Sequence, residues 1–519
     1  GPDWDKHGEL FFVNTVNGHF FHSITGAHFN RGVSIDENPH AYELLRTHAD
    51  HFHYDKTGSW TKSRDGAANE FGGGHCHIGM MIYEGTNWPA EYRGRVFTLN
   101  QHGRRANQEH LERRGSGYVA RHLPDLLIAK DRFFRAIDIT TGPDGGVHII
   151  DWSDIGECHE SSGVHRSSGR VFKVTHRDGP LPPRRDLSKF PQEELAGLQL
   201  SDNAWEARMA RLLLDPESDA AIAVLHQILE TSPDPSHRLR ALWSLALLRD
   251  PAALTRDRMA RLLKDDNEHI RAWAIRLLTD RFPLDTVFSK RPDRPEPAEA
   301  SVDLLPALVD LATRDPSPLV RLTLASTLQR LPARLRSRLA QPLVRHAEDA
   351  ADHNLPLMIW YGLIPVADTD PSGLAQVAAG SQIPMVRRFI TRRLAGAKAQ
   401  AALDELLATT VKADEKAKTA ILRGLDEAYA GWRNAPAPPA WKPFTASLRG
   451  TAGSALHDRI RSLDVLFGDG RALNEVKRLA LDPKVSLETR KSALRTLINQ
   501  GPDDLRLTCL QLLNTRFLN

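Results

Sequence analysis

The chain of 519 residues is poor in cysteine. Cys76, Cys158 and Cys509 are its only three cysteines, they lie far apart, and no two of them form a Cys-x-x-Cys pair. A disulfide framework and a zinc ribbon both need paired cysteines, so the sequence excludes both. The Cys-x-x-Cys-His motif that attaches haem is also absent, because Glu157-Cys158-His159 lacks the first cysteine. We therefore expect no haem site in this chain.

Long apolar runs and an excess of one charge are absent as well. No uninterrupted apolar run approaches the roughly 18 residues that a membrane-spanning helix needs. The 68 Lys and Arg residues nearly balance the 65 Asp and Glu residues, which gives a net charge of +3. No basic run is long enough to follow a phosphate backbone. We expect no transmembrane segment and no nucleic-acid partner, and any targeting segment would lie upstream of Gly1.

Histidine is concentrated in the first third of the chain, where 17 of the 23 histidines lie within residues 1–176. The same region has short β-type runs flanked by turn residues, at residues 9–13, 95–99, 147–151 and 170–174. This pattern predicts a β region over residues 1–176. The apolar spacing near residues 38–53 predicts a helical insertion within it. We expect any chemistry to be concentrated in this region.

A Pro-rich linker, expected at residues 177–192, leads to a region of different pattern. Over residues 193–519 apolar residues recur at helical spacing, and a unit of Asp, then Arg about six residues later, then a small residue is repeated. The clearest copies are Asp202/Arg208/Ala210, Asp234/Arg240/Ala241, Asp266/Arg271/Ala274, Asp315/Arg321/Ala325 and Asp482/Arg490/Ala493. Helix pairs that repeat in this way resemble HEAT-type α-solenoids, in which each pair buries its apolar face against its neighbours.

Two features of the predicted solenoid have a structural and a functional interpretation. The Asp/Arg pattern is expected to join repeats through hydrogen bonds from side chains to the backbone at the turns between helices. Met358, Trp360 and Tyr361 are expected to lie in the core. The alternative is that these three residues form an exposed anchor for a protein partner on the solenoid.

Several segments of the β region carry a family resemblance. They are residues 75–83 (HCHIGMMIY), 87–97 (NWPAEYRGRVF), 100–105 (NQHGRR), 142–152 (GPDGGVHIIDW) and 169–174 (GRVFKV). In order and spacing they resemble the sugar/sorbosone dehydrogenase class of six-bladed β-propellers. They resemble still more closely the PVC-type membrane-bound dehydrogenases, which consist of this propeller, HEAT repeats and a cytochrome c domain. The resemblance implies a multidomain fold, with about three blades of a six-bladed propeller followed by a HEAT-like α-solenoid.

The resemblance also implies a function. It is the oxidation of a sugar or alcohol by pyrroloquinoline quinone (PQQ), with electrons passed to a cytochrome c domain or another acceptor. The implied location is the periplasm or the outside of the cell envelope. Two alternatives come from other classes of protein. One is a non-catalytic scaffold that binds glycans or protein partners, and the other is a metal-dependent propeller hydrolase.

Three sets of residues are candidates for this chemistry. Arg104 and Arg105 would bind the carboxylates of PQQ. His75, His77 or His102 would take the proton of the substrate hydroxyl. The candidates for metal binding are Asp144, Asp151, Asp154 and His159, and the resemblance allows for a calcium ion near Asp144. In the alternative interpretation the arginines pair with nearby acids such as Glu109 and Glu112, and the histidines cap turns.

Overall fold

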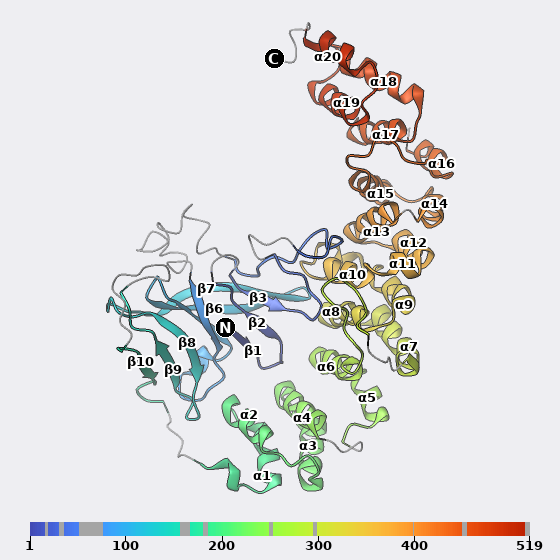
Figure 1. Cartoon of the computed structure of the whole chain (residues 1–519). Helices are drawn as coiled ribbons and strands as arrows, with labels where there is room; N and C mark the ends of the chain where they lie inside the picture. The colour runs from blue at the N-terminus through green and yellow to red at the C-terminus, as the bar shows by residue number, and fades with distance from the viewer. Residues whose placement is uncertain are drawn as a thin grey trace. The chain divides into compact units, whose positions relative to one another are not determined.

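The computed structural model describes residues 1–15, 19–30, 36–50, 76–155, 167–179, 185–248, 253–293, 298–397, 399–448 and 454–513. Strands come first along the chain and helices follow (Figure 1). The chain forms two compact units, which interleave in sequence. The first consists of Gly1–Glu37, Glu43–Arg281 and Asp315–Thr327, and the second of Asn38–Tyr42, Phe282–Arg314 and Leu328–Asn519. The units therefore do not separate between Val174 and Gln192, where strands give way to helices.

The first unit contains three antiparallel sheets that follow one another along the chain. In each sheet consecutive strands are hydrogen-bonded neighbours. The strands are β1 (Pro2–Trp4), β2 (Leu10–Phe12) and β3 (Phe21–Ser23) in the first sheet, β4 (His77–Ile82), β5 (Arg95–Asn100), β6 (Arg105–Arg114) and β7 (Gly117–Ile128) in the second, and β8 (Ala136–Thr141), β9 (Val147–Asp151) and β10 (Arg170–Val174) in the third.

The middle sheet has an apolar layer on each face, because successive side chains of a strand point to opposite sides. On one face Met80 packs with Phe11 of the first sheet, and on the other Met81 packs with Ile139 of the third. The three sheets are thus stacked in chain order, and β4 lies beside both β1 and β8. Gly79, with φ +65°, allows the close approach to β8, since a Cβ there would lie 2.8 Å from Cα of Asp138.

The helical insertion expected near residues 38–53 is wrong for its described part, because residues 36–50 form no helix. The Asn38 side chain accepts the amide of His40 in a tight turn. Beyond that turn the backbone bonds to other segments. Leu45 donates to His28 O at 2.9 Å, and His48 donates to Phe20 O at 2.9 Å. Pairing with distant backbone groups therefore replaces the bonds to the residue four back that a helix needs.

The described helices of the first unit pack side by side. α3 packs against α4, α4 against α6, and α6 against α8. The helices are α1 (Gln192–Gly197), α2 (Ala204–Leu212), α3 (Asp219–Thr231), α4 (Pro235–Leu247), α5 (Arg256–Leu262), α6 (Glu268–Thr279) and α8 (Pro318–Thr327).

The second unit arranges most of its helices in two rows. One row runs from α7 through α9, α12 and α14 to α16, and the other from α10 through α13 and α15 to α17. The helices are α7 (Ala298–Arg314), α9 (Ala333–Leu343), α10 (Leu355–Leu363), α11 (Val366–Thr369), α12 (Pro371–Gly380), α13 (Pro384–Gly396), α14 (Gln400–Thr409), α15 (Glu415–Ala428), α16 (Trp441–Ala446), α17 (Ser454–Leu466), α18 (Gly470–Leu481), α19 (Leu487–Gln500) and α20 (Leu505–Leu513). No helix in the described part of the chain is long and apolar enough to cross a membrane.

The Asp/Arg pattern has the structural role that the sequence predicts. Arg240 donates to Ser201 O at 2.6 Å, Arg271 to Asp265 O at 2.7 Å, and Arg321 to Asp315 O at 2.9 Å. These bonds satisfy backbone oxygens at the turns between helices. Arg208 departs from the pattern, because it faces a cavity and lies 3.7 Å from the Asp3 carboxylate.

The expectation that Met358, Trp360 and Tyr361 lie in the core is confirmed, since all three are fully buried. The Trp360 indole stacks on the ring of Tyr42, with centroids 5.3 Å apart, and donates to His40 O at 2.8 Å. The short segment Asn38–Tyr42 thus completes the packing of the second unit.

Candidate functional site

Strand pairing brings several of the predicted residues to one end of the sheets. His77 begins β4 and pairs with Asn100, which in turn pairs with Arg105. Asp151 ends β9 and pairs with Ala136 at the start of β8. β4 and β8 run side by side in the same direction, because Gly79 approaches Asp138 and the Thr141 hydroxyl lies 3.1 Å from Sδ of Met81. His77, Arg105 and Asp151 therefore share one end of two neighbouring sheets, whereas His75 and His159 lie outside the described residues.

His77 lies beside a buried pair that the sequence did not single out as a site. The rings of His77 and His19 have centroids 4.5 Å apart, and Nε2 of His19 lies 3.3 Å from Oε1 of Glu109. Burial lowers the pKa of His19 to about 3, so its imidazole is neutral at neutral pH. Glu109 is one of the acids that the alternative interpretation pairs with the arginines. Nothing in the sequence marks His19 as a site residue, because only the fold brings it to Glu109, which lies 90 positions away.

Arg105 is not open to a carboxylated cofactor. Its Nη1 donates to Oδ2 of Asp125 at 2.8 Å, and Asn107 donates to the other oxygen of that carboxylate at 2.6 Å. The side chains of Arg105 and Asp125 are each 8% exposed. The expected cofactor-binding role of Arg105 is therefore replaced by a buried ion pair across the β6–β7 hairpin. Arg104 is partly exposed and has φ +53°, and His102 is buried.

The predicted metal-binding carboxylates are held by cations and backbone amides instead. Asp151 accepts the amides of Arg135 and Ser153 at 2.7 and 3.0 Å, and its other oxygen lies 2.6 Å from Arg170. Asp144 pairs with Lys173. Within the described ranges, no group of three or more His, Cys, Asp or Glu side chains could hold a metal ion. Asp144, Asp151 and the buried Asp154 thus form no metal site by themselves.

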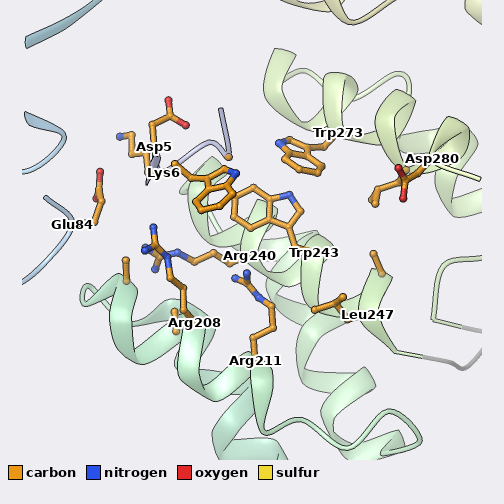
Figure 2. Close-up of a pocket in the computed structure, with 16 residues that line it drawn as sticks. Asp5, Lys6, Glu84, Arg208, Arg211, Arg240, Trp243, Leu247, Trp273 and Asp280 are labelled. Atoms are coloured by element: carbon orange, nitrogen blue, oxygen red, sulfur yellow. The ribbon is translucent and has the colours of Figure 1, made fainter. Parts of the chain in front are cut away.

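A larger candidate site lies elsewhere in the first unit, in a cavity of about 490 Å³. The β1–β2 turn, α2, α4 and α6 form its walls, and Figure 2 shows the side chains that line it. The lining residues are Trp4, Asp5, Lys6, Gly8, Glu84, Ala204, Ala207, Arg208, Arg211, Arg240, Trp243, Ala246, Leu247, Trp273, Leu277 and Asp280. Three indoles and four basic side chains thus meet around one hollow.

The β1–β2 turn fixes the indole wall of this cavity. Gly8 has φ +77°, and a Cβ there would lie 2.7 Å from ring atoms of both Trp243 and Trp273. Only glycine combines this conformation with so close a contact. The indole N–H of Trp273 donates to His7 O at 2.7 Å, and the two indoles have centroids 5.2 Å apart at an angle of 66°. The turn therefore sets the position and the tilt of the aromatic surface.

The charged wall of the cavity is partly buried. Burial, together with the nearby charges of Arg240 and Arg208, lowers the pKa of Arg211 to about 10. Burial raises the pKa of Glu84, while Arg240 and Lys6 oppose that rise. Uncharged partners hold Arg211, which donates to the Ser244 hydroxyl at 3.2 Å and the Gln199 side-chain oxygen at 3.1 Å.

The cavity offers flat apolar surfaces beside basic donors and acidic acceptors of hydrogen bonds, which is the composition of a small-molecule site. Sequence reasoning missed it, although a signal existed. Trp243 and Trp273 follow Arg240 and Arg271 of consecutive repeat units by three and two residues. Nearby places in consecutive repeat units lie close together on a solenoid.

Comparisons with known proteins agree with the change from strands to helices after Val174. Residues 1–178 match the family model of a domain of unknown function, DUF7133, and residues 222–285 match HEAT repeats. The first third of the chain is therefore similar to a DUF7133 domain and a later part to HEAT repeats, which agrees with the predicted order of β structure followed by helices. Comparison with curated proteins finds no match.

One similar solved structure is the crystal structure of an engineered protein from the Northeast Structural Genomics Consortium. The two chains share 17% sequence identity, and the match covers 60% of this chain and 89% of that chain. The TM-score is 0.27, so this likeness carries no argument about fold or function.

Proposed function

We propose that this chain is a carbohydrate-binding protein whose ligand site is the cavity of the first unit. The observation that carries the proposal is the pair of tilted indoles, Trp243 and Trp273, beside acidic and basic side chains. One face of a sugar ring is lined with C–H groups and packs on the face of an indole, whereas its hydroxyls need donors and acceptors at the edge. The cavity offers both kinds of group, and a glycan-binding scaffold is one of the functions that the sequence left open.

Titration with a panel of mono- and oligosaccharides, followed by tryptophan fluorescence and calorimetry, tests the proposal. Trp273→Ala is expected to weaken binding at least tenfold, because it removes a stacking surface. Trp432→Ala is the matched control, since Trp432 is 37% exposed and does not line the cavity. A panel in which no sugar gives saturable binding would contradict the proposal, and so would an equal loss in the control.

Quinone-dependent oxidation of a sugar or alcohol is the second candidate function. It is favoured by the stacking of three sheets, with β4 beside both β1 and β8, since blades of the resembled propellers stack face to face around their first strands. The pairing of Arg105 with Asp125 opposes it. Arg105 is one of the two arginines expected to bind the PQQ carboxylates, and its guanidinium already binds a carboxylate of the protein.

Dye reduction with added PQQ and calcium, over the same sugar panel, tests this second candidate. Turnover that needs PQQ and is lost in His77→Ala would support the oxidation. If no sugar is oxidised, this second candidate is contradicted and carbohydrate binding is the proposal that stands. The periplasmic or extracellular location and the cytochrome acceptor rest on the family resemblance. Fractionation of cells that express the native gene tests the location.

A further inference from the structure

Three arginines enter the cavity from one side. Arg208 and Arg211 lie three residues apart on α2, and Arg240 comes from α4. Figure 2 shows these side chains below the indole of Trp243, away from Asp280. Residues three apart on a helix project from the same face, so the two arginines of α2 face the hollow together. The charged wall is therefore formed by neighbouring helices.

The positive charge of this wall is only partly balanced. Within the part of the chain that the structure describes, no carboxylate lies within 4.0 Å of the Arg211 guanidinium, which is held by Ser244 and Gln199. Arg240 donates to the carbonyl oxygen of Ser201, and Arg208 lies 3.7 Å from the Asp3 carboxylate with its side chain 47% exposed. Like charges in a desolvated place repel one another, and a bound anion relieves that repulsion.

The indoles and the arginines together define the chemistry of the ligand. Trp243 lines the cavity, and Arg211 lies over its indole with the guanidinium carbon 5.4 Å from the centroid. A ligand stacked on the indole would therefore carry its substituents to the guanidinium group. Guanidinium groups bind carboxylate and sulfate oxygens through paired, charge-assisted hydrogen bonds.

We infer that the cavity selects an acidic sugar, one whose ring carries a carboxylate or a sulfate ester, over the neutral sugar of the same shape. The inference rests on the proposed carbohydrate-binding function and names the class of ligand for that same cavity. The acidic side chains leave room for this assignment. In Figure 2 Asp280 lies on the opposite side of the indoles from the arginines, and Glu84 lies on the side of Arg208 and Arg240.

Calorimetry of the full chain with glucose, glucuronate and glucose 6-sulfate tests the inference and distinguishes the two anionic groups. At least one acidic sugar is expected to bind at least tenfold more tightly than glucose at 25 mM salt, and the ratio should shrink at 500 mM salt because screening weakens the charge term. Arg211→Gln is expected to bring the ratio to within about threefold, because the acidic sugars lose a charge-assisted contact that glucose does not make. Arg208→Gln, at an exposed side chain that tolerates change, should lower the ratio too and covers the case in which Arg211→Gln fails to fold.

The matched control is Arg314→Gln, because Arg314 is 79% exposed in the second unit and lies outside the cavity. Equal binding of glucose and both acidic sugars overturns the inference and leaves the proposed function standing. Absence of binding by every sugar overturns the proposed function and the inference with it. Tight binding of inorganic sulfate or PQQ with no binding of acidic sugars overturns the inference as well, because the site would then recognise an anion without a sugar ring.

Discussion

The imidazole rings of His7 and His269 lie face to face, with centroids 3.8 Å apart and planes 7° from parallel. His7 belongs to the β1–β2 turn and His269 to the first turn of α6. Asp5 lies 3.6 Å from Nδ1 of His7, and Glu268 lies 3.8 Å from Nε2 of His269. Because two charged rings at this separation repel each other, the stack holds best when at most one ring carries a proton. Protonation thus acts on the turn that forms the indole wall.

The first unit is expected to lose stability as the pH falls below about 6.5. Burial lowers the pKa of His269, with a further decrease from the charge of His7, and burial lowers that of His19. The unfolded chain therefore binds these protons at higher pH than the folded chain does. Each of these two histidines then lowers the free energy of unfolding by about 1.4 kcal/mol for every pH unit below 6.5, until the pKa of the folded state is reached.

Glu9 extends the loss of stability to lower pH. Burial would raise the pKa of Glu9, but Arg276 and His22 hold it well below its usual range. Its contribution is present above the pKa of the unfolded chain, about 4.5, and is lost as the pH falls further. Urea denaturation from pH 7.5 to 2.5 measures both effects, the histidines above pH 4.5 and Glu9 below it. His269→Asn should flatten the curve between pH 6.5 and 5, whereas the exposed His110→Asn should leave it unchanged.

Gly8→Ala is expected to disrupt the cavity. The new Cβ would collide with Trp243 and Trp273, and the left-handed backbone adds strain, so we expect a loss of about 2–4 kcal/mol of stability and at least tenfold weaker sugar binding. Gly431→Ala is the control, since Gly431 has φ +82° but open space around its Cβ position. That variant should lose only about 1 kcal/mol and should bind sugar normally. Equal effects in the two variants would show that strain alone matters.

Asp151→Asn is expected to lower stability rather than to remove a metal site. The carboxylate is buried and receives donors from Arg135, Ser153 and Arg170, so we expect a loss of about 2–4 kcal/mol. Asp131→Asn removes the exposed partner of the same arginine and should cost less than about 1 kcal/mol. Thermal unfolding with and without EDTA measures both. A decrease in melting temperature on adding EDTA to the wild-type chain would restore the metal hypothesis.

Arg336→Gln is expected to be among the most destabilising single changes in the second unit. Arg336 and Asp285 form a two-bond ion pair at 2.7 and 2.8 Å with both side chains 1% exposed. Removing the guanidinium leaves a buried carboxylate whose remaining cation, Arg291, lies 3.7 Å away, so we expect a loss of about 3 kcal/mol. Removing the exposed Arg314–Asp310 pair should cost less than about 0.5 kcal/mol. Denaturant melts of both variants make the comparison.

Local sequence patterns predicted the elements better than the sites. The runs at 95–99, 147–151 and 170–174 coincide with β5, β9 and β10, because alternation and turn residues are properties of the segment itself. The Asp/Arg units marked helix turns for the same reason. The segment near residue 45 was misread, since its backbone bonds to residues 20 and 28, which no local period reveals.

The sequence places Trp243 and Trp273 in consecutive repeat units, but it does not reveal the cavity, which depends on contacts between distant residues. The need for glycine at position 8 arises from its contact with Trp273, which lies 265 residues later in the sequence. Arg105 looked like a cofactor ligand because nothing in the sequence places Asp125 opposite it. The β-bulge between Ala106 and Gln108 changes the register of that hairpin, so counting residues would not have found the pair.

The contact of the Gly8 turn with Trp243 and Trp273 also determines when this part of the chain can fold during translation. Ribosomes add about 5–20 residues per second, so the second of these indoles emerges roughly 13–53 s after the turn does. Until then Glu9 lacks Arg276, and the apolar side of the turn has nothing to cover it. The first unit therefore completes its folding late in translation, and its earliest residues are the ones that a chaperone would have to hold longest.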